Sequence, residues 1–150
     1  LSETDLKAEY ERQAGLLKGA EQYQLRHIVL PSESAAKDVM AALKKGQDFA
    51  RLAHEKSIDA SKDRGGELGW LMSTDIVPPV ARAIASLKKG TLVTSPVEVE
   101  GRWHVVQMQD RRPFQIPKME ETLPQLRQAL VQQRRIQLLE QLAKAANIQQ

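Results

Sequence analysis

The chain has 150 residues, of which 41% are apolar and only 4% aromatic, so it suits one average domain or a smaller domain with arms and excludes wholesale disorder. Lys and Arg exceed Asp and Glu by 22 − 19 = 3, a basic excess too diffuse to require nucleic acid, and charges interrupt every apolar run well short of a membrane span. The absence of cysteine excludes disulfides, thiolate nucleophiles and Cys-rich zinc sites.

A helix and then a strand are predicted at the start of the chain. Ser2 can cap the helix, and Leu6 and Tyr10 share one face at helical spacing. Residues 23–30 predict a strand with apolar side chains on both faces, which indicates a central position in a sheet. Pro31 ends it.

Two helices are predicted next, over about residues 32–45 and 48–56. Gly46, after two lysines, suits the end of the first helix, because cations favour the negative end of a helix dipole and glycine accepts a left-handed backbone. The same Lys-Lys-Gly ending at residues 88–90 predicts the close of a short helix that begins near Pro78.

A glycine-rich loop is predicted between these helices, over residues 57–71, because its three glycines imply positive φ angles or close backbone approach. Residues 94–99 and 103–109 then predict two strands of a hairpin around a Glu-Gly turn. The order of elements indicates an α+β domain with a mostly antiparallel sheet.

A long C-terminal helix is predicted over residues 122–146. Its leucines form a broad apolar stripe, which must pack on the sheet domain, on the N-terminal helix, on missing chain or on another subunit.

Two of the three histidines are candidates for chemistry. His27 and His104 each lie in the middle of a predicted strand, on an apolar face, and their strands are expected to be neighbours. Each alone could be a core histidine bonded to a backbone carbonyl, but together they indicate a paired site, because neutral imidazoles both donate and accept hydrogen bonds. His54 lies among charged residues and suits a solvated or capping role. Metal-ligand spacings, a phosphate loop and a nucleophile elbow are all missing from the sequence.

Several short motifs, in register, resemble a parvulin-type peptidyl-prolyl isomerase domain over about residues 23–111. They are Arg26-His27-Ile28-Val29-Leu30, Asp48-Phe49-Ala50-Arg51-Leu52-Ala53, Ser57 to Asp59, Gly65-Gly66-Glu67-Leu68-Gly69-Trp70, Leu87 to Gly90, Ser95-Pro96-Val97 and Trp103-His104-Val105-Val106. The flanking helices are similar, more loosely, to the arms of bacterial extracytoplasmic foldases, in which both ends of the chain build a chaperone module.

This resemblance implies a fold and a division of the chain. The fold is an α+β parvulin-like, mostly antiparallel four-stranded sheet with surrounding helices, flanked by helical arms. We expect an N-terminal arm at residues 1–22, an isomerase domain at 23–112 and a C-terminal arm at 113–150.

The resemblance also implies site residues, without cofactor or metal. The expected catalytic residues are His27, Asp59 and His104. The expected substrate-binding residues are Leu68, Met72, Ile76, Val80, Val99 and Trp103. Val80 stands where the family usually has Phe, and Val99 where it has Ser or Thr, so the strength of the activity stays open.

The expected partners are unfolded or proline-containing polypeptides, with no nucleic acid and no membrane span, and with a homodimer through the arms left open. The resemblance implies a periplasmic or otherwise extracytoplasmic location. The chain begins at Leu1 without a visible targeting segment, so we expect it to be a fragment of something longer. Two other interpretations remain: a non-catalytic parvulin fold that holds unfolded polypeptide as a chaperone, and a structural domain whose long helix dimerises.

Overall fold

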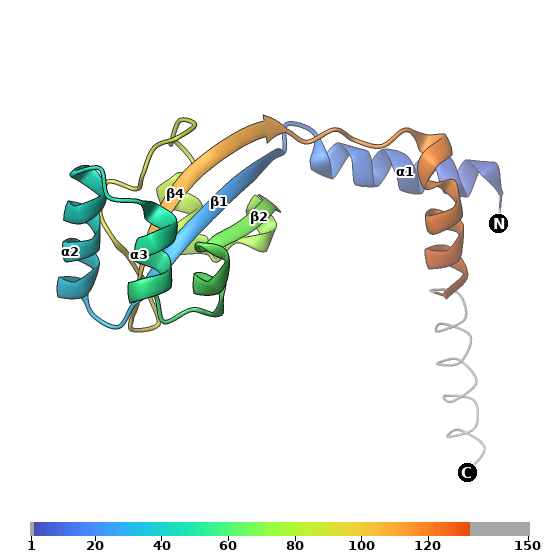
Figure 1. Cartoon of the computed structure of the whole chain (residues 1–150). Helices are drawn as coiled ribbons and strands as arrows, with labels where there is room; N and C mark the ends of the chain where they lie inside the picture. Colours follow the sequence, from blue (N-terminus) through green and yellow to red (C-terminus); the bar gives the residue numbers. More distant parts are fainter. Residues whose placement is uncertain (1, 133–150) are drawn as a thin grey trace, which may run out of the picture. The chain divides into compact units, whose positions relative to one another are not determined.

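A computed structural model describes residues 2–132 of the chain (Figure 1). The chain divides into two compact units. One consists of Ala20–Phe114, and the other contains the chain before it, up to Gly19, and after it, from Gln115. No helix in the described part is long and apolar enough to cross a membrane.

The Ala20–Phe114 unit is built on a four-stranded antiparallel sheet. Its strands are β1 (Glu21–Leu30), β2 (Glu67–Met72), β3 (Val97–Val99) and β4 (Arg102–Pro113), in the order β2-β1-β4-β3. The two long central strands pair along their whole length, from Glu21 opposite Pro113 to Leu30 opposite Trp103. The predicted α+β class and four-stranded antiparallel sheet are confirmed.

One face of the sheet is closed by two helices, α2 (Glu33–Lys44) and α3 (Phe49–Lys56), which lie side by side over β1 and β4 in Figure 1. Ser32 and Asp48 cap them, each accepting a hydrogen bond from a backbone N–H of the first turn. The core on this face is wholly apolar. It consists of Ile28, Leu30, Ala36, Val39, Met40, Phe49, Leu52, Ala53 and Val105.

The other face is covered by a shorter helix, α4 (Pro78–Ile84), and by the chain around it. Two prolines in its first turn begin α4, where a missing N–H costs nothing. The core on this face consists of Tyr23, Leu25, Val80, Ile84, Val93, Val106 and Met108.

The second unit contains α1 (Glu3–Leu17) and a helix over residues 119–132. Ser2 caps α1, as predicted. Leu6 and Leu126 are buried, and the Tyr10 hydroxyl donates a hydrogen bond to the Pro117 carbonyl at 2.8 Å. The remainder of the predicted C-terminal helix, residues 133–146, lies outside the described residues.

Three predicted elements differ from the structure. Part of the predicted glycine loop is strand β2, which hydrogen-bonds to β1 and tolerates Gly69 because it is a short edge strand. Helix α4 ends at Ile84, before the Lys-Lys-Gly segment. The hairpin is unequal, because β3 has only 3 residues whereas β4 continues to Pro113 against β1.

Candidate active site

The alternation of the two central strands brings the histidine pair together. His27 on β1 lies opposite Val106, and His104 on β4 lies opposite Val29, so both imidazoles leave the same face of the sheet. Their ring centroids are 5.5 Å apart, with the planes tilted by 53°. The expected neighbouring histidines are therefore in contact range.

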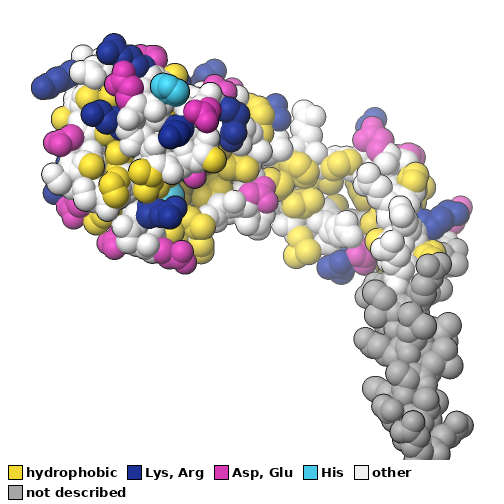
Figure 2. Space-filling view, turned by 60° about the horizontal axis from the view of Figure 1, so that its bottom comes forward, with side chains coloured by type: hydrophobic (Ala, Val, Ile, Leu, Met, Phe, Trp, Pro, Cys, Tyr) yellow, Lys and Arg dark blue, Asp and Glu magenta, His cyan; other side chains and the backbone are white. Residues whose placement is uncertain are grey.

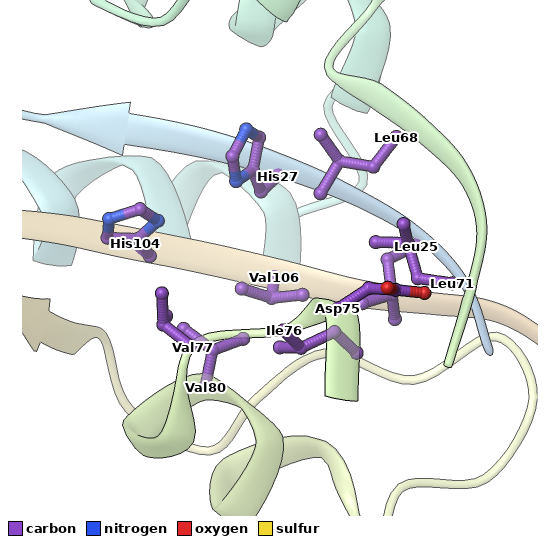
Figure 3. A pocket seen from close by; sticks show the side chains of 10 residues that line it. All are labelled: Leu25, His27, Leu68, Leu71, Asp75, Ile76, Val77, Val80, His104 and Val106. Atoms are coloured by element: carbon purple, nitrogen blue, oxygen red, sulfur yellow. The ribbon is translucent and has the colours of Figure 1, made fainter. Parts of the chain in front are cut away.

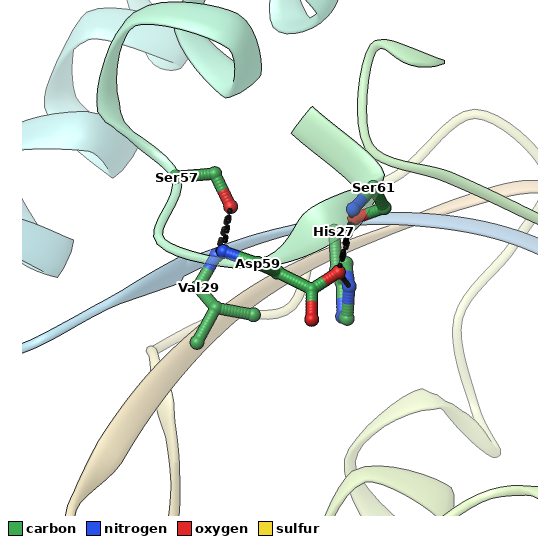
Figure 4. A network of polar contacts seen from close by, with 5 residues as sticks. All are labelled: His27, Val29, Ser57, Asp59 and Ser61. Carbon is green, nitrogen blue, oxygen red and sulfur yellow. Dashed lines mark hydrogen bonds and ion pairs between the residues drawn. The ribbon is translucent and has the colours of Figure 1, made fainter. Parts of the chain in front are cut away.

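Asp59 joins the pair from the loop after α3. It caps the 3-10 helix η1 (Ala60–Arg64), and its Oδ2 lies 3.1 Å from His27 Nε2 (Figure 4). The same oxygen accepts the Ser61 N–H at 3.0 Å and the Ser61 hydroxyl at 2.5 Å. One carboxylate oxygen thus collects three hydrogen bonds.

The charge state of Asp59 follows from these partners. Burial raises its pKa, but the hydrogen bonds from Ser61 and His27 outweigh burial and lower the pKa to about 2. Because an ionised carboxylate only accepts, we assign the shared hydrogen to His27 Nε2. Burial, and then the neighbouring His27, lower the pKa of His104, which favours a neutral ring near pH 7.

A second serine ties this loop to the sheet. Ser57 is buried, and its Oγ accepts the Val29 N–H at 3.1 Å and the Asp59 N–H at 3.3 Å. The Ile58 N–H donates to the Val29 carbonyl at 2.8 Å. Residues 57–59 are therefore fixed along β1, which places Asp59 beside His27.

Gly66 holds the backbone of His27 on the same edge of β1, because the N–H groups of His27 and Val29, two residues apart on a strand, point the same way. The His27 N–H donates to the Gly66 carbonyl at 2.9 Å, next to a register shift between Leu25 and Arg26. Gly66 has a φ of +82°, and a Cβ there would lie 2.3 Å from the His27 carbonyl oxygen. Only glycine allows this close approach.

An apolar pocket of about 180 Å³ opens beside the two histidines (Figure 3). Both imidazoles line it, together with three of the predicted substrate-binding residues, Leu68, Ile76 and Val80. The pocket also has lining residues that were not predicted. They are Leu25, Leu71, Asp75, Val77 and Val106. Leu25 and Val106 could have been found, because strand alternation places them on the histidine face.

Three predicted substrate-binding residues lie away from the pocket lining. Trp103 packs against the core under α2 and α3. It is the neighbour of His104 on β4, and adjacent side chains of a strand point to opposite faces of the sheet. Val99 packs on the core beneath α4, and Met72 ends β2, where its N–H donates to Asp75. We therefore do not carry Trp103 forward as a substrate contact.

The site is built for non-covalent chemistry. The pocket supplies apolar walls and two imidazoles, one of which is hydrogen-bonded to Asp59 behind it, so it can desolvate and orient a bound group. In residues 2–132, His, Cys, Asp and Glu side chains form no group of three or more that could hold a metal ion.

On the face in Figure 2, basic and acidic side chains are interspersed over the Ala20–Phe114 unit.

The chain matches a known protein family and is similar to curated proteins. The family model described as the PPIC-type PPIASE domain matches residues 1–124. A "Probable parvulin-type peptidyl-prolyl cis-trans isomerase" of Bordetella pertussis is 40% identical over 99% of this chain, and the chain spans 58% of that protein's length.

Two solved structures are similar over most of the chain. One comes from work on PEB4 and the periplasmic protein Cj1289, two SurA-like chaperones of Campylobacter jejuni. It has a TM-score of 0.64 and 29% identity, and the match covers 100% of this chain and 62% of that one. The peptidylprolyl isomerase PrsA of Bacillus anthracis has a TM-score of 0.60 and 26% identity, with 89% of this chain and 56% of that one covered.

Proposed function

Because the chain belongs to the PPIC-type family of parvulin peptidyl-prolyl isomerase domains, we propose that it catalyses cis–trans isomerisation of Xaa-Pro bonds in unfolded or folding polypeptides. The observation that carries this proposal is the apolar pocket beside the His27–His104 pair. A proline ring is small and apolar, and its amide must lose water and resonance to rotate.

The reaction needs no nucleophile. The barrier to rotation is about 18–20 kcal/mol, and each 1.36 kcal/mol removed is about tenfold in rate. Leu68, Ile76 and Val80 hold the proline ring in an environment of low polarity, which favours the twisted amide because it has less charge separation on its carbonyl.

The polar residues of the site have separate roles in this proposal. His27 and His104 form one wall and fix the position of the amide. Asp59 orients His27 and keeps a negative charge near the carbonyl, where it disfavours the planar, charge-separated resonance form. Ser57 and Ser61 are positioning residues, since both act through Asp59.

The test is a protease-coupled assay on a proline-containing peptide. We expect catalysis above the uncatalysed rate, and Asp59→Asn should lower kcat/KM by about tenfold or more, equivalent to about 1.4 kcal/mol of barrier. Asp63→Asn, an exposed change four residues away in η1, is the matched control and should keep the wild-type value. A wild-type rate equal to the uncatalysed rate overturns the enzyme assignment.

A second candidate function is the holding of unfolded polypeptide. The unit outside Ala20–Phe114 has a hollow of about 510 Å³ between α1 and the 119–132 helix. Its lining joins apolar Leu6, Met119 and Leu123 to charged residues of both signs, Glu3, Lys7, Glu120 and Arg127. The similarity to SurA-like chaperones supports this candidate. If Asp59→Asn loses isomerisation but still suppresses aggregation of an unfolded client, both functions reside in one chain. If wild type suppresses aggregation and isomerises nothing, the chain is a non-catalytic chaperone.

The division of labour and the location are part of the same proposal. We infer that the isomerase domain can be separated from the arms near residues 22 and 113, that the clients are proline-containing chains, and that the protein works outside the cytoplasm. The likeness to a structure from work on two SurA-like chaperones, of which Cj1289 is described as periplasmic, supports the location. A homodimer through the arms remains a prediction, and sedimentation at several concentrations tests it.

A further inference from the structure

The pocket has one unusual wall, the carboxylate of Asp75. Every other lining side chain is either apolar or an imidazole. In Figure 3 Asp75 lies at the end of the pocket beside Leu71, away from His104. The carboxylate therefore adds a charge to an otherwise uncharged apolar end of the pocket.

The position of Asp75 is fixed by local structure. It ends the short helix η2 (Ser73–Asp75), and its Oδ2 accepts the Met72 N–H at 3.0 Å. This bond closes the turn between β2 and α4 and holds the carboxylate in the lining of the pocket. Residue 75 is exposed, so an incoming peptide can reach it.

Asp75 also has no cation of its own in the described chain. The ion pairs among residues 2–132 use other acids. The pocket thus presents one unpaired negative charge beside apolar walls, which a positively charged side chain complements.

We infer that Asp75 is a specificity-determining residue that favours a lysine or arginine next to the proline of the client. The inference rests on the proposed isomerase function, since it concerns which Xaa-Pro or Pro-Xaa sequences the same pocket accepts. A long basic side chain can place its apolar stem against Leu71 while its charged end meets the carboxylate.

The test compares isomerisation of matched peptides by exchange NMR, which needs no coupling protease. One series carries Lys, Leu or Glu immediately before proline, and a second carries them immediately after it. An exposed ion pair changes a rate by up to about fivefold. Asp75 should attract Lys and repel Glu, so in one of the two series kcat/KM should be about three to ten times higher for the Lys peptide than for the Glu peptide. The ratio should shrink in high salt.

The decisive variant is Asp75→Asn, whose amide oxygen can still accept the Met72 N–H. We expect the Lys-to-Glu ratio to fall to about one, whatever the rate on the Leu peptide. Asp38→Asn, on the outer side of α2 across the sheet, makes the same change in net charge and should keep the wild-type ratio.

The outcomes separate this inference from the proposed function. A wild type that isomerises the Leu peptide but shows equal rates on Lys and Glu peptides in both series overturns the role of Asp75. A ratio that Asp75→Asn leaves unchanged does the same. A wild type that isomerises none of the peptides overturns the isomerase function itself.

Discussion

The two faces of the central sheet are formed by the same pair of strands, β1 and β4, but one face is a closed core and the other borders a pocket. On one face Ile28 and Val105 are fully buried beneath α2 and α3, in a closed apolar core. On the other face the adjacent residues, His27 and His104, border an open pocket. Alternation along a strand therefore lets neighbouring residues serve stability and chemistry separately, provided that something joins the two faces.

Gly66 lies against both His27, from the pocket face, and Phe49, from the closed core. Its substitution therefore gives the largest expected loss of stability. A Cβ there would lie 2.3 Å from the His27 carbonyl oxygen and 3.3 Å from the Phe49 ring. Gly69 is the matched control, because it also has a positive φ, +76°, but nothing within 4 Å of its Cβ. We expect Gly69→Ala to cost about 1 kcal/mol through backbone strain, and Gly66→Ala about 2 kcal/mol more through overpacking.

Urea unfolding of both glycine variants provides the measurement. Equal losses in the free energy of unfolding would mean that the contact with His27 carries no weight. A greater loss for Gly66→Ala, with a lowered isomerase rate in the folded fraction, would show that this glycine supports core and site together.

Val105 and Val106 offer a direct comparison of the faces, since they are the same residue type, adjacent in β4, and 0% and 1% exposed. Val105→Ala leaves a cavity in the closed core and should cost about 2 kcal/mol of stability. Val106→Ala only widens an existing pocket, so we expect a cost nearer to about 1 kcal/mol but a fall in kcat/KM of up to about tenfold.

Chemical denaturation and the peptide assay should be run on both valine variants. The comparison breaks if Val106→Ala is the less stable variant, or if Val105→Ala loses as much activity per folded molecule.

Within the site, acidification acts through His104 and Asp59, and theirs is the smallest expected effect on stability. The folded pKa of His104 lies below its usual 6.5, so the folded state resists protonation and stability falls as pH drops through that lowered pKa. Asp59, with a pKa of about 2 against a usual 3.8, contributes stability above about pH 4 that is lost as pH falls towards 2. Its side chain is 37% exposed, so solvent screening limits this contribution to about 1 kcal/mol.

Urea midpoints across about pH 7 to 2.5 test the two windows. Asp59→Asn should flatten the loss below about pH 4, and His104→Asn the loss that begins near 6.5. An unchanged acid profile in both variants would contradict the assignment of these groups.

Much of the fold follows from local sequence, because the caps and strand patterns are local signals. Ser2, Ser32 and Asp48 begin helices in the structure, and the apolar pattern of residues 23–30 marks the central strand β1. Strand β2 was missed because its glycines look like a loop. It exists through pairing with β1, a long-range interaction that local sequence does not show.

The site could be predicted less completely than the fold. The pairing of His27 with Asp59 depends on how the 57–61 loop lies against β1, and Ser61, which holds Asp59, carried no distinguishing signal. Trp103 is expected from the resemblance to bind substrate, but the alternation along β4 that places His104 in the pocket places Trp103 on the other face of the sheet. Asp75 and Val77 reach the pocket through the turn after β2, which no periodic pattern describes.

The chain enters and leaves the Ala20–Phe114 unit at one place. Glu21 lies opposite Pro113, and the Phe114 N–H donates to the Ala20 carbonyl at 2.9 Å. The 95 residues of the Ala20–Phe114 unit therefore join Gly19 to Gln115 as a tight turn would, because the two ends of the unit are adjacent. An insertion closed in this way adds little loop entropy to its host. The Ala20–Phe114 unit can therefore be replaced by another domain whose ends are paired, or by a short turn. In either case the distance between Gly19 and Gln115 that the surrounding chain must bridge stays the same.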